Sequence, residues 1–308
     1  MTQASTAGTR NPPDALADSP FFSRQEHFER TRSTNDVVSG WLAAGEPEVC
    51  LATADEQTGG RGREGRTWTA PPGSSLLLSL GFRPRWLAAD RTWQIAAVIA
   101  LAMADAAEEV AGLADGAVRL KWPNDLVVEF TREGPAGEEE DDDSLRAAEV
   151  SGDGSADQAT ATRVRKLAGV LGETTGLGTD DPCVVIGIGI NADWRRDAFP
   201  PDLAAAMTSL RDASGGRPID RVQLLDGFLG RLEMRVDGLR KGHFAISDWQ
   251  DRQITTGRSV DLVHAGGDRT TVRAVGVDSH SGGLVVEDGG RDRVVHSGEI
   301  LHVRLAGV

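Results

Sequence analysis

A stretch rich in glycine and arginine is the part of this sequence best suited to chemistry. Residues 59–68 read Gly-Gly-Arg-Gly-Arg-Glu-Gly-Arg-Thr-Trp, so Arg61, Arg63 and Arg66 are interspersed with glycines. Glycine lets the backbone approach a ligand closely, and arginine supplies a permanent planar charge that matches carboxylate and phosphate oxygens. The stretch therefore predicts a loop that folds over an anionic ligand.

Two other interpretations of this loop are possible. Its glycines fit the dinucleotide-binding pattern G-x-G-x-x-G, but that pattern should open a helix. Here a Pro-Pro-Gly turn and the strand-like run Ser75–Phe82 follow instead, which disfavours a dinucleotide site. A solvated Arg-Gly loop without a ligand stays open from this stretch alone, because short motifs often match by chance.

Further polar motifs occur along the chain, each with a structural alternative. Ser33-Thr34-Asn35 is typical of a helix cap, Lys121 and Asp125 could form an exposed charge pair, and a glycine-containing strand could accommodate either a ligand or a packed helix. The motifs are Ser33-Thr34-Asn35, Gln57, Lys121-Trp122-Pro123-Asn124-Asp125, Lys-Leu-Ala-Gly-Val-Leu-Gly-Glu at 166–173, and Gly-Ile-Gly-Ile-Asn at 187–191.

Apolar periodicity predicts the elements that position these motifs. A helix should begin at Ser33 or Thr34, and Asp90 should cap a buried, alanine-rich helix over residues 91–110. Pro123 cannot donate to a sheet ladder, so the strand that starts at Val118 should break there and resume at Leu126. Further strands are expected at 49–54, 75–82, 166–173 and 183–190, and further helices at 202–212 and 219–239.

The chain changes character after Gly257. Short β runs alternate with glycine turns there, a pattern typical of a small β-barrel. The runs cover residues 259–264, 270–277, 283–287, 293–296 and 300–305. A large α+β domain followed by a small β domain is therefore expected.

Composition narrows the class of protein. The 308 residues are 39% hydrophobic and 26% charged with a net charge of −14, which suits a soluble globular enzyme rather than a nucleic-acid binder. Residues 133–160 hold ten acidic side chains and one basic one, a net charge of −9, and residues 1–20 are polar; both are expected to be disordered. Cys50 and Cys183 are expected to be unpaired thiols in a cytoplasmic protein. No signal peptide or membrane span is expected, and the six histidines show no metal-ligand spacing.

Taken together and in order, the motifs from Ser33 to the C-terminus resemble the biotin protein ligases. The resemblance implies an α+β fold: a mixed and antiparallel sheet with packed helices over residues 21–250, of the biotin/lipoate ligase type related to class II synthetases, then an SH3-like barrel over 251–308. This sequence departs from the family by an acidic insertion at 133–162, where the family has a tight hairpin. Some members carry an N-terminal helix-turn-helix domain. The segment before Ser33 is too short for one, so no DNA binding is expected.

The resemblance also implies an activity and residue roles. Biotin and ATP, with Mg²⁺ on the phosphates, would form biotinoyl-5′-AMP. A lysine of a biotin carboxyl carrier domain of an acyl-CoA carboxylase would then accept the biotin. The biotin contacts would be Ser33, Thr34, Asn35, Gln57, Arg61, Gly62, Arg63 and Lys166. The ATP contacts would be Arg61, Arg63, Arg66, Trp68, Lys121, Asn124, Lys166 and Asn191. The catalytic residues would be Lys166, Arg63 and Asp125.

Chemistry supports these residue types. An anionic carboxylate must approach an anionic triphosphate, and their repulsion is large in a low dielectric, so fixed cations suit the first step. The incoming lysine must then lose a proton, and Asp125 could orient the lysine or accept that proton. A lipoate–protein ligase is the nearest alternative. A non-catalytic nucleotide-binding or nucleic-acid-binding module is a more distant one.

Overall fold

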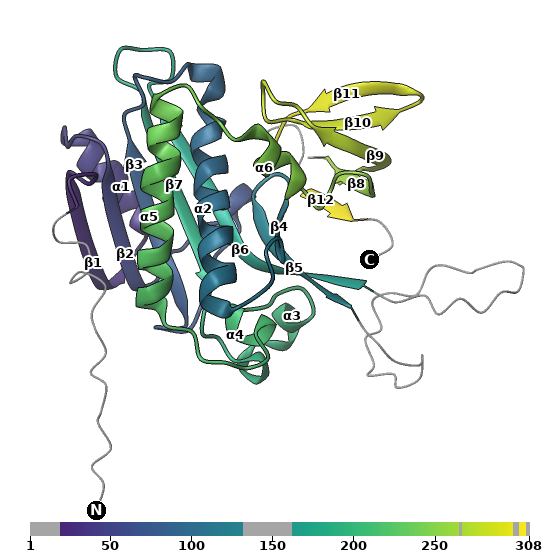
Figure 1. Cartoon of the computed structure of the whole chain (residues 1–308), viewed down its shortest axis with the longest axis horizontal. Helices are drawn as coiled ribbons and strands as arrows, with labels where there is room; N and C mark the ends of the chain where they lie inside the picture. The colour runs from purple at the N-terminus through teal and green to yellow at the C-terminus, as the bar shows by residue number, and fades with distance from the viewer. Residues whose placement is uncertain (1–18, 132–161, 265–266, 298–301, 306–308) are drawn as a thin grey trace, which may run out of the picture.

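The computed structural model describes residues 19–131, 162–264, 267–297 and 302–305 (Figure 1). The expected tail and acidic insertion lie outside these residues, apart from Ser19, Pro20 and Thr162. Two sheets form the framework. The first contains β1 (Arg24–Thr31), β2 (Cys50–Gln57), β3 (Ser75–Phe82), β4 (Val118–Lys121), β5 (Asp125–Thr131), β6 (Thr162–Thr175) and β7 (Cys183–Asn191), in the spatial order β1-β2-β3-β7-β6-β5-β4.

Helices cover both faces of this sheet. Figure 1 shows α2 and α5 side by side across one face, with α1 behind the sheet. The helices are α1 (Thr34–Ala43), α2 (Trp93–Ala111), α3 (Pro201–Ala204), α4 (Leu210–Ala213), α5 (Arg221–Arg240) and α6 (Ile246–Asp251). In the part of the chain that the structure describes, no helix combines the length and apolar character needed to cross a membrane.

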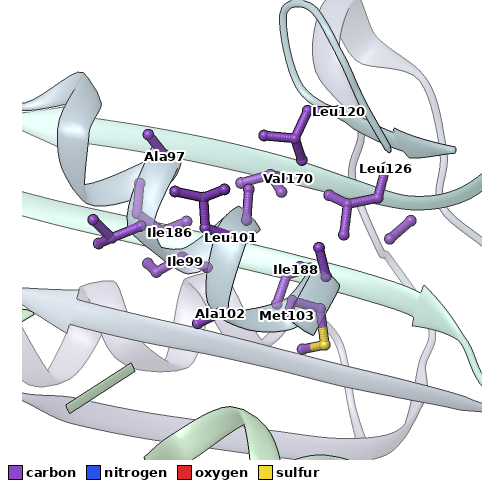
Figure 2. Packing of buried hydrophobic residues seen from close by; sticks show 14 of the residues in the cluster. Ala97, Ile99, Leu101, Ala102, Met103, Leu120, Leu126, Val170, Ile186 and Ile188 are labelled. Carbon is purple, nitrogen blue, oxygen red and sulfur yellow. The ribbon is translucent and has the colours of Figure 1, made fainter. Parts of the chain in front are cut away.

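The core explains why the central strands are almost entirely apolar. Successive side chains of a strand point to opposite faces, so Ile186 and Ile188 of β7 pack toward α2, where they meet Leu101 and Met103 (Figure 2). Val185 points to the other face and packs with residues of α1. Because both faces are covered, β3 and β7 need apolar side chains in nearly every position.

The β5–β6 hairpin sets the register of two predicted site residues. Asp125 lies opposite Gly169 at one end of the hairpin, and Thr131 lies opposite Thr162 at the other. The register shifts between Leu126 and Val127, so the ladder carries an irregularity beside the site. The insertion therefore joins the hairpin at the end farther from Asp125.

A second sheet, antiparallel throughout, contains β8 (Ser259–Val263), β9 (Arg269–Val277), β10 (Leu284–Asp288), β11 (Arg291–Val295) and β12 (His302–Leu305), in the order β11-β10-β9-β8-β12. It contacts the first sheet at several points. The indole of Trp122 donates to Gly282 O at 3.0 Å, and Arg258 pairs with Glu129 at 2.6 Å. The two sheets are thus joined beside the 121–125 turn.

Several predictions about elements were wrong in detail. Asp90 does not cap α2: a short 3₁₀ turn precedes the helix, Thr92 is its N-cap residue, and Asp90 pairs with His280 at 3.3 Å instead. The helix expected at 202–212 is divided into α3 and α4. The edge strand β1 was not predicted, because its charged, partly exposed sequence lacks a clear apolar alternation.

Candidate active site

A cavity of about 460 Å³ lies where the Arg-Gly loop, the start of α1, the 121–125 turn, β6 and β7 meet. All the predicted site residues except Asn191 line it. The lining includes Ser33, Thr34, Asn35, Gln57, Arg61, Gly62, Arg63, Arg66, Trp68, Lys121, Asn124, Asp125 and Lys166. Motifs spread over more than a hundred residues of sequence therefore converge on one cavity.

Asn191 does not line the cavity, although the sequence motif predicted an ATP contact. Its side chain is fully buried at the end of β7. There it donates to Thr208 O at 2.9 Å and accepts from Ser75 Oγ at 3.3 Å. In this structure Asn191 joins β3, β7 and the 208 segment.

Four polar but uncharged residues of the lining lie around the start of α1. Ser33 precedes the first turn of α1, and Thr34 and Asn35 begin that helix. Gln57 ends β2, and its Oε1 accepts from Thr34 N at 2.8 Å. Because a backbone N–H can only donate, this bond fixes which atom of the Gln57 amide is the oxygen.

Two of the lining residues form an ion pair. Lys166 Nζ is 2.6 Å from Asp125 Oδ1, and the two side chains are 31% and 15% exposed. The Lys166 ammonium also lies 5.4 Å from the centre of the Trp68 ring, within range of a cation–π contact. The bridge brings together the KWPND turn and the strand that carries Lys166, as expected for residues that act on one ligand.

Glycines in β6 and β7 form a floor on which two side chains lie. A Cβ at Gly189 would be 2.7 Å from Trp68 Nε1, and a Cβ at Gly187 would be 2.2 Å from Asn35 Oδ1. Distances this short are not tolerated without movement, so Trp68 and Asn35 lie in van der Waals contact with bare backbone. The sequence left a ligand or a packed helix as alternatives for these glycines. Gly187 fits the packed helix, because Asn35 belongs to α1, whereas Gly189 makes room for Trp68 of the Arg-Gly loop.

The Arg-Gly loop is a small hairpin closed by Arg61 and Thr67 as a bridge pair. Arg61 reaches across the cavity mouth, where it pairs with Asp36 of α1 at 2.7 Å and with Glu173 of β6 at 2.9 Å. These carboxylates raise the pKa of the Arg61 guanidinium, the bond to Asp36 being the largest cause. Arg61 therefore ties the loop to α1 and to β6.

Arg63 reaches in another direction. Its Nη2 donates to Ser297 O at 2.5 Å, which ties the loop to the segment after β11. The side chain is 20% exposed, and burial lowers the pKa of its guanidinium from the ordinary value. A cation that has lost much of its water in this way interacts more strongly with an anion placed beside it.

Sequence reasoning missed part of the lining. Leu203, Ala206 and Met207 lie in and after α3, within the range where one continuous helix was expected. Their backbone pairs with Lys166: Lys166 N donates to Ala206 O, and Thr208 N donates to Lys166 O. The signal was absent from the sequence because these contacts are made by main-chain groups, which any residue supplies.

The donor set suits anions rather than a bound metal ion. Among the described residues, no group of three or more histidine, cysteine, aspartate or glutamate side chains is arranged to hold a metal. The lining of the cavity instead combines several cationic side chains with neutral amides and hydroxyls. Such a cavity can bind a neutral polar group and an anion at the same time.

Comparison with known proteins agrees with this geometry. The model of the biotin/lipoate A/B protein ligase family matches residues 27–191. The biotin–[acetyl-CoA-carboxylase] ligase of Mycobacterium tuberculosis is 27% identical over 89% of this chain and 87% of that protein. A bifunctional ligase/repressor of Bacillus spizizenii is 30% identical over 61% of this chain, and the match spans only 46% of that protein.

The fold has solved counterparts as well. The biotin protein ligase of Aquifex aeolicus, solved with biotin and ATP, superposes with a TM-score of 0.68 at 22% identity, covering 92% of this chain and 100% of that one. The family match covers more than half of the chain and includes most of the motifs that line the cavity. The chain belongs to the biotin/lipoate A/B protein ligase family.

Proposed function

We propose that this protein is an ATP-dependent biotin–protein ligase. It forms biotinoyl-5′-AMP from biotin and ATP, then transfers the biotin to a lysine of a biotin carboxyl carrier domain of an acyl-CoA carboxylase. Relatives with biotin ligase names and the Aquifex structure with biotin and ATP support this choice. The observation that carries it is one cavity whose lining combines cationic side chains with a hydrogen-bonded group of neutral hydroxyls and amides.

The neutral side chains of the cavity lining suit the ring system of biotin. Ser33, Thr34, Asn35 and Gln57 offer hydroxyl and amide groups without a net charge, which match a ureido group that both donates and accepts. Lipoate has no ureido group, so these polar side chains would lose their partners with lipoate. Unpaired buried polar groups are costly, which favours biotin over lipoate.

The cationic side chains of the cavity lining suit adenylate formation. A carboxylate oxygen of biotin attacks the α-phosphorus of ATP, and the bond from that phosphorus to the bridging oxygen breaks to release pyrophosphate. In this proposal Lys166 and Arg63 stabilise the charge that gathers between carboxylate and phosphate, while Arg66 and Lys121, which also line the cavity, serve the phosphates. Fixed charges are effective here because they need no reorganisation when the reaction occurs.

Transfer follows from the same arrangement. The amine of the carrier lysine attacks the carbonyl carbon of the adenylate, an amide bond forms, and AMP leaves with the electron pair of the broken bond. Asp125 is the carboxylate nearest Lys166 and is only 15% exposed. When Lys166 contacts the adenylate, Asp125 has an oxygen available to orient the carrier amine or accept its proton.

The domain bounds, the residue roles, the use of magnesium and the location are also proposals. Residues 21–250 form the ligase domain and residues 251–308 an SH3-like domain, supported by the separate five-stranded antiparallel sheet. The expected roles of the site residues rest on their place in the cavity, except for Asn191. Magnesium enters as part of the ATP substrate, bound by phosphate oxygens. A cytoplasmic location stays a prediction.

One experiment separates the candidates. Purified protein is incubated with ATP, an apo biotin carboxyl carrier domain, and either labelled biotin or labelled lipoate. We expect biotin to be attached to the carrier, pyrophosphate to be released with biotin, and neither product to form with lipoate. Attachment of lipoate would instead identify a lipoate ligase, and no turnover with either acid would refute ligase activity.

A further inference from the structure

Ser79 is a buried polar residue in an otherwise apolar strand. β3 reads Ser-Leu-Leu-Leu-Ser-Leu-Gly-Phe, and Ser79 is 0% exposed. It is not among the described residues that line the cavity. A hydroxyl sealed from water must find partners inside the protein, so the partners of Ser79 indicate why a serine is needed there.

Both partners of Ser79 are side chains at the start of α1. Ser79 Oγ donates to Asn35 Oδ1 at 2.6 Å and lies 2.7 Å from Thr34 Oγ1. Thr34 Oγ1 is also 3.2 Å from Gln57 Oε1, which accepts from Thr34 N at 2.8 Å. One chain of hydrogen bonds therefore runs through Asn35, Ser79, Thr34 and Gln57, and Ser79 is its interior member.

This chain sets the orientation of the groups that line the cavity. Ser79 gives its single hydroxyl proton to Asn35 Oδ1, so this contact ties the amide of Asn35 to β3. Asn35 is 5% exposed and its Nδ2 is buried without a hydrogen-bond partner. The crowding of Asn35 against Gly187 leaves the amide little room to turn, so Ser79 and Gly187 together hold it in one place.

We propose that Ser79 is a positioning residue for the ring-binding side chains of the cavity. It touches no ligand itself; it holds the Thr34 hydroxyl and the Asn35 amide in the arrangement that a ureido ring meets. This rests on the proposed biotin ligase function and adds to it a residue buried beneath the first turn of α1. Linked hydrogen bonds in a low dielectric reinforce one another. Loss of the Ser79 hydroxyl should therefore disturb Thr34 and Asn35 together.

Substitution by alanine provides the test, with a control on the same strand. Ser75 lies on the same face of β3 because it is four residues away, and it is also 0% exposed. Its hydroxyl donates to Asn191, outside the cavity lining. Ser75→Ala therefore matches Ser79→Ala in the loss of one buried hydroxyl, but it leaves the hydrogen bonds of Thr34 and Asn35 intact.

Calorimetry with biotin alone reports on these ring-binding side chains without turnover. We expect Ser79→Ala to weaken biotin binding about tenfold, in line with one lost hydrogen-bond network, while the KM for ATP changes less than twofold. Ser75→Ala should leave biotin affinity unchanged even if it lowers the melting temperature equally. If Ser79→Ala does not fold, Ser79→Cys takes its place, because a thiol of similar size donates only weakly.

A double-mutant cycle with Asn35→Ala identifies the route of the effect. If Ser79 acts through Asn35 and Thr34, the loss in the double variant should be smaller than the sum of the two single losses. Full additivity, or unchanged biotin affinity in a folded Ser79 variant, would overturn the proposal. Both results are judged against wild-type protein that binds biotin; absence of biotin binding by wild type would count against the proposed function itself.

Discussion

Removal of the Lys166 ammonium should abolish adenylate formation while the fold survives. In Lys166→Ala the cavity loses a cation held 2.6 Å from Asp125 and 5.4 Å from the Trp68 ring centre. The remaining cavity still has Arg63, Arg66 and Lys121 in its lining. Substrates should therefore still bind, but the charge that develops between carboxylate and α-phosphate would lack its nearest preorganised partner.

The expected loss of reaction rate is much larger than the expected loss of stability, so the two effects can be told apart. Loss of one preorganised charge contact at a reacting centre costs about 100- to 1000-fold in rate, or about 2.7–4 kcal/mol. The Lys166–Asp125 bridge is partly open to water, with 31% and 15% exposure, so its loss should cost stability about 1 kcal/mol or less. That corresponds to roughly 2–4 °C in melting temperature for a chain of this size.

A second ion pair on the same strand provides the control. Arg258 pairs with Glu129 of β5 at 2.6 Å, with 34% and 27% exposure, four residues along from Asp125. This pair lies outside the described lining of the cavity. Arg258→Ala should thus match Lys166→Ala in thermal stability but keep the wild-type rate of biotin-dependent pyrophosphate release, followed continuously at saturating ATP.

A rate within threefold of wild type in Lys166→Ala would refute the assignment of Lys166 to the adenylation step. An equal loss of rate in Arg258→Ala would refute the reasoning differently, because it would show that any broken ion pair on β5 disables the enzyme.

Two further substitutions and one segment replacement test other parts of the chain. Arg63→Gly removes both a cavity cation and the bond to Ser297, so bound adenylate should dissociate faster, which a chase experiment measures. Asp125→Asn keeps the shape but loses charge and basicity, so transfer from preformed adenylate should slow more than adenylation in single-turnover assays. Replacement of residues 133–160 by a short Gly-Asp turn should leave activity and melting temperature close to wild type, because a segment of this acidic composition has few side chains to add to a core, and shortening a loop changes closure entropy by about 1 kcal/mol or less.

Each of these has a contrary outcome. An unchanged adenylate off-rate would show that Arg63 serves only to tie the loop to Ser297. Equal slowing of both half-reactions by Asp125→Asn would mean that Asp125 acts through its bond to Lys166. A shortened variant that fails to fold would show that the inserted segment contributes to the packed structure, and activity that depends on ionic strength before shortening but not after would indicate a charge effect on ATP or a basic partner.

Apolar runs predicted the central strands well, because buried strands such as β3 and β7 must be apolar on both faces. Capping and edge positions were predicted less well. Asp90 looks like a helix cap but lies in a 3₁₀ turn, and β1 carries charges because it lies at the sheet edge, where such side chains stay hydrated and discourage pairing with other chains.

Residues that line the cavity were predicted where a short sequence motif carries the side-chain chemistry. Contacts were missed where they depend on the tertiary fold. Lys166 and Asp125 were both named, but their pairing depends on the register of β5 and β6. The bond from Arg63 to Ser297 spans 234 residues and has no local signal. Asn191 belongs to a matching motif yet is turned into the interior by Thr208.

The hairpin of β5 and β6 has a use for protein engineering. Its ion pair lies at one end, and Thr131 and Thr162 face each other at the other. Asp125 and Thr131 are separated by six residue steps, which in a strand corresponds to about 20 Å. A folded domain with adjacent termini, spliced in place of the natural insertion, would therefore be held at a short and fixed radius from the reactive adenylate. An antibody fragment or a peptide-binding module placed there would tether a chosen target beside the ligase without touching its reacting groups.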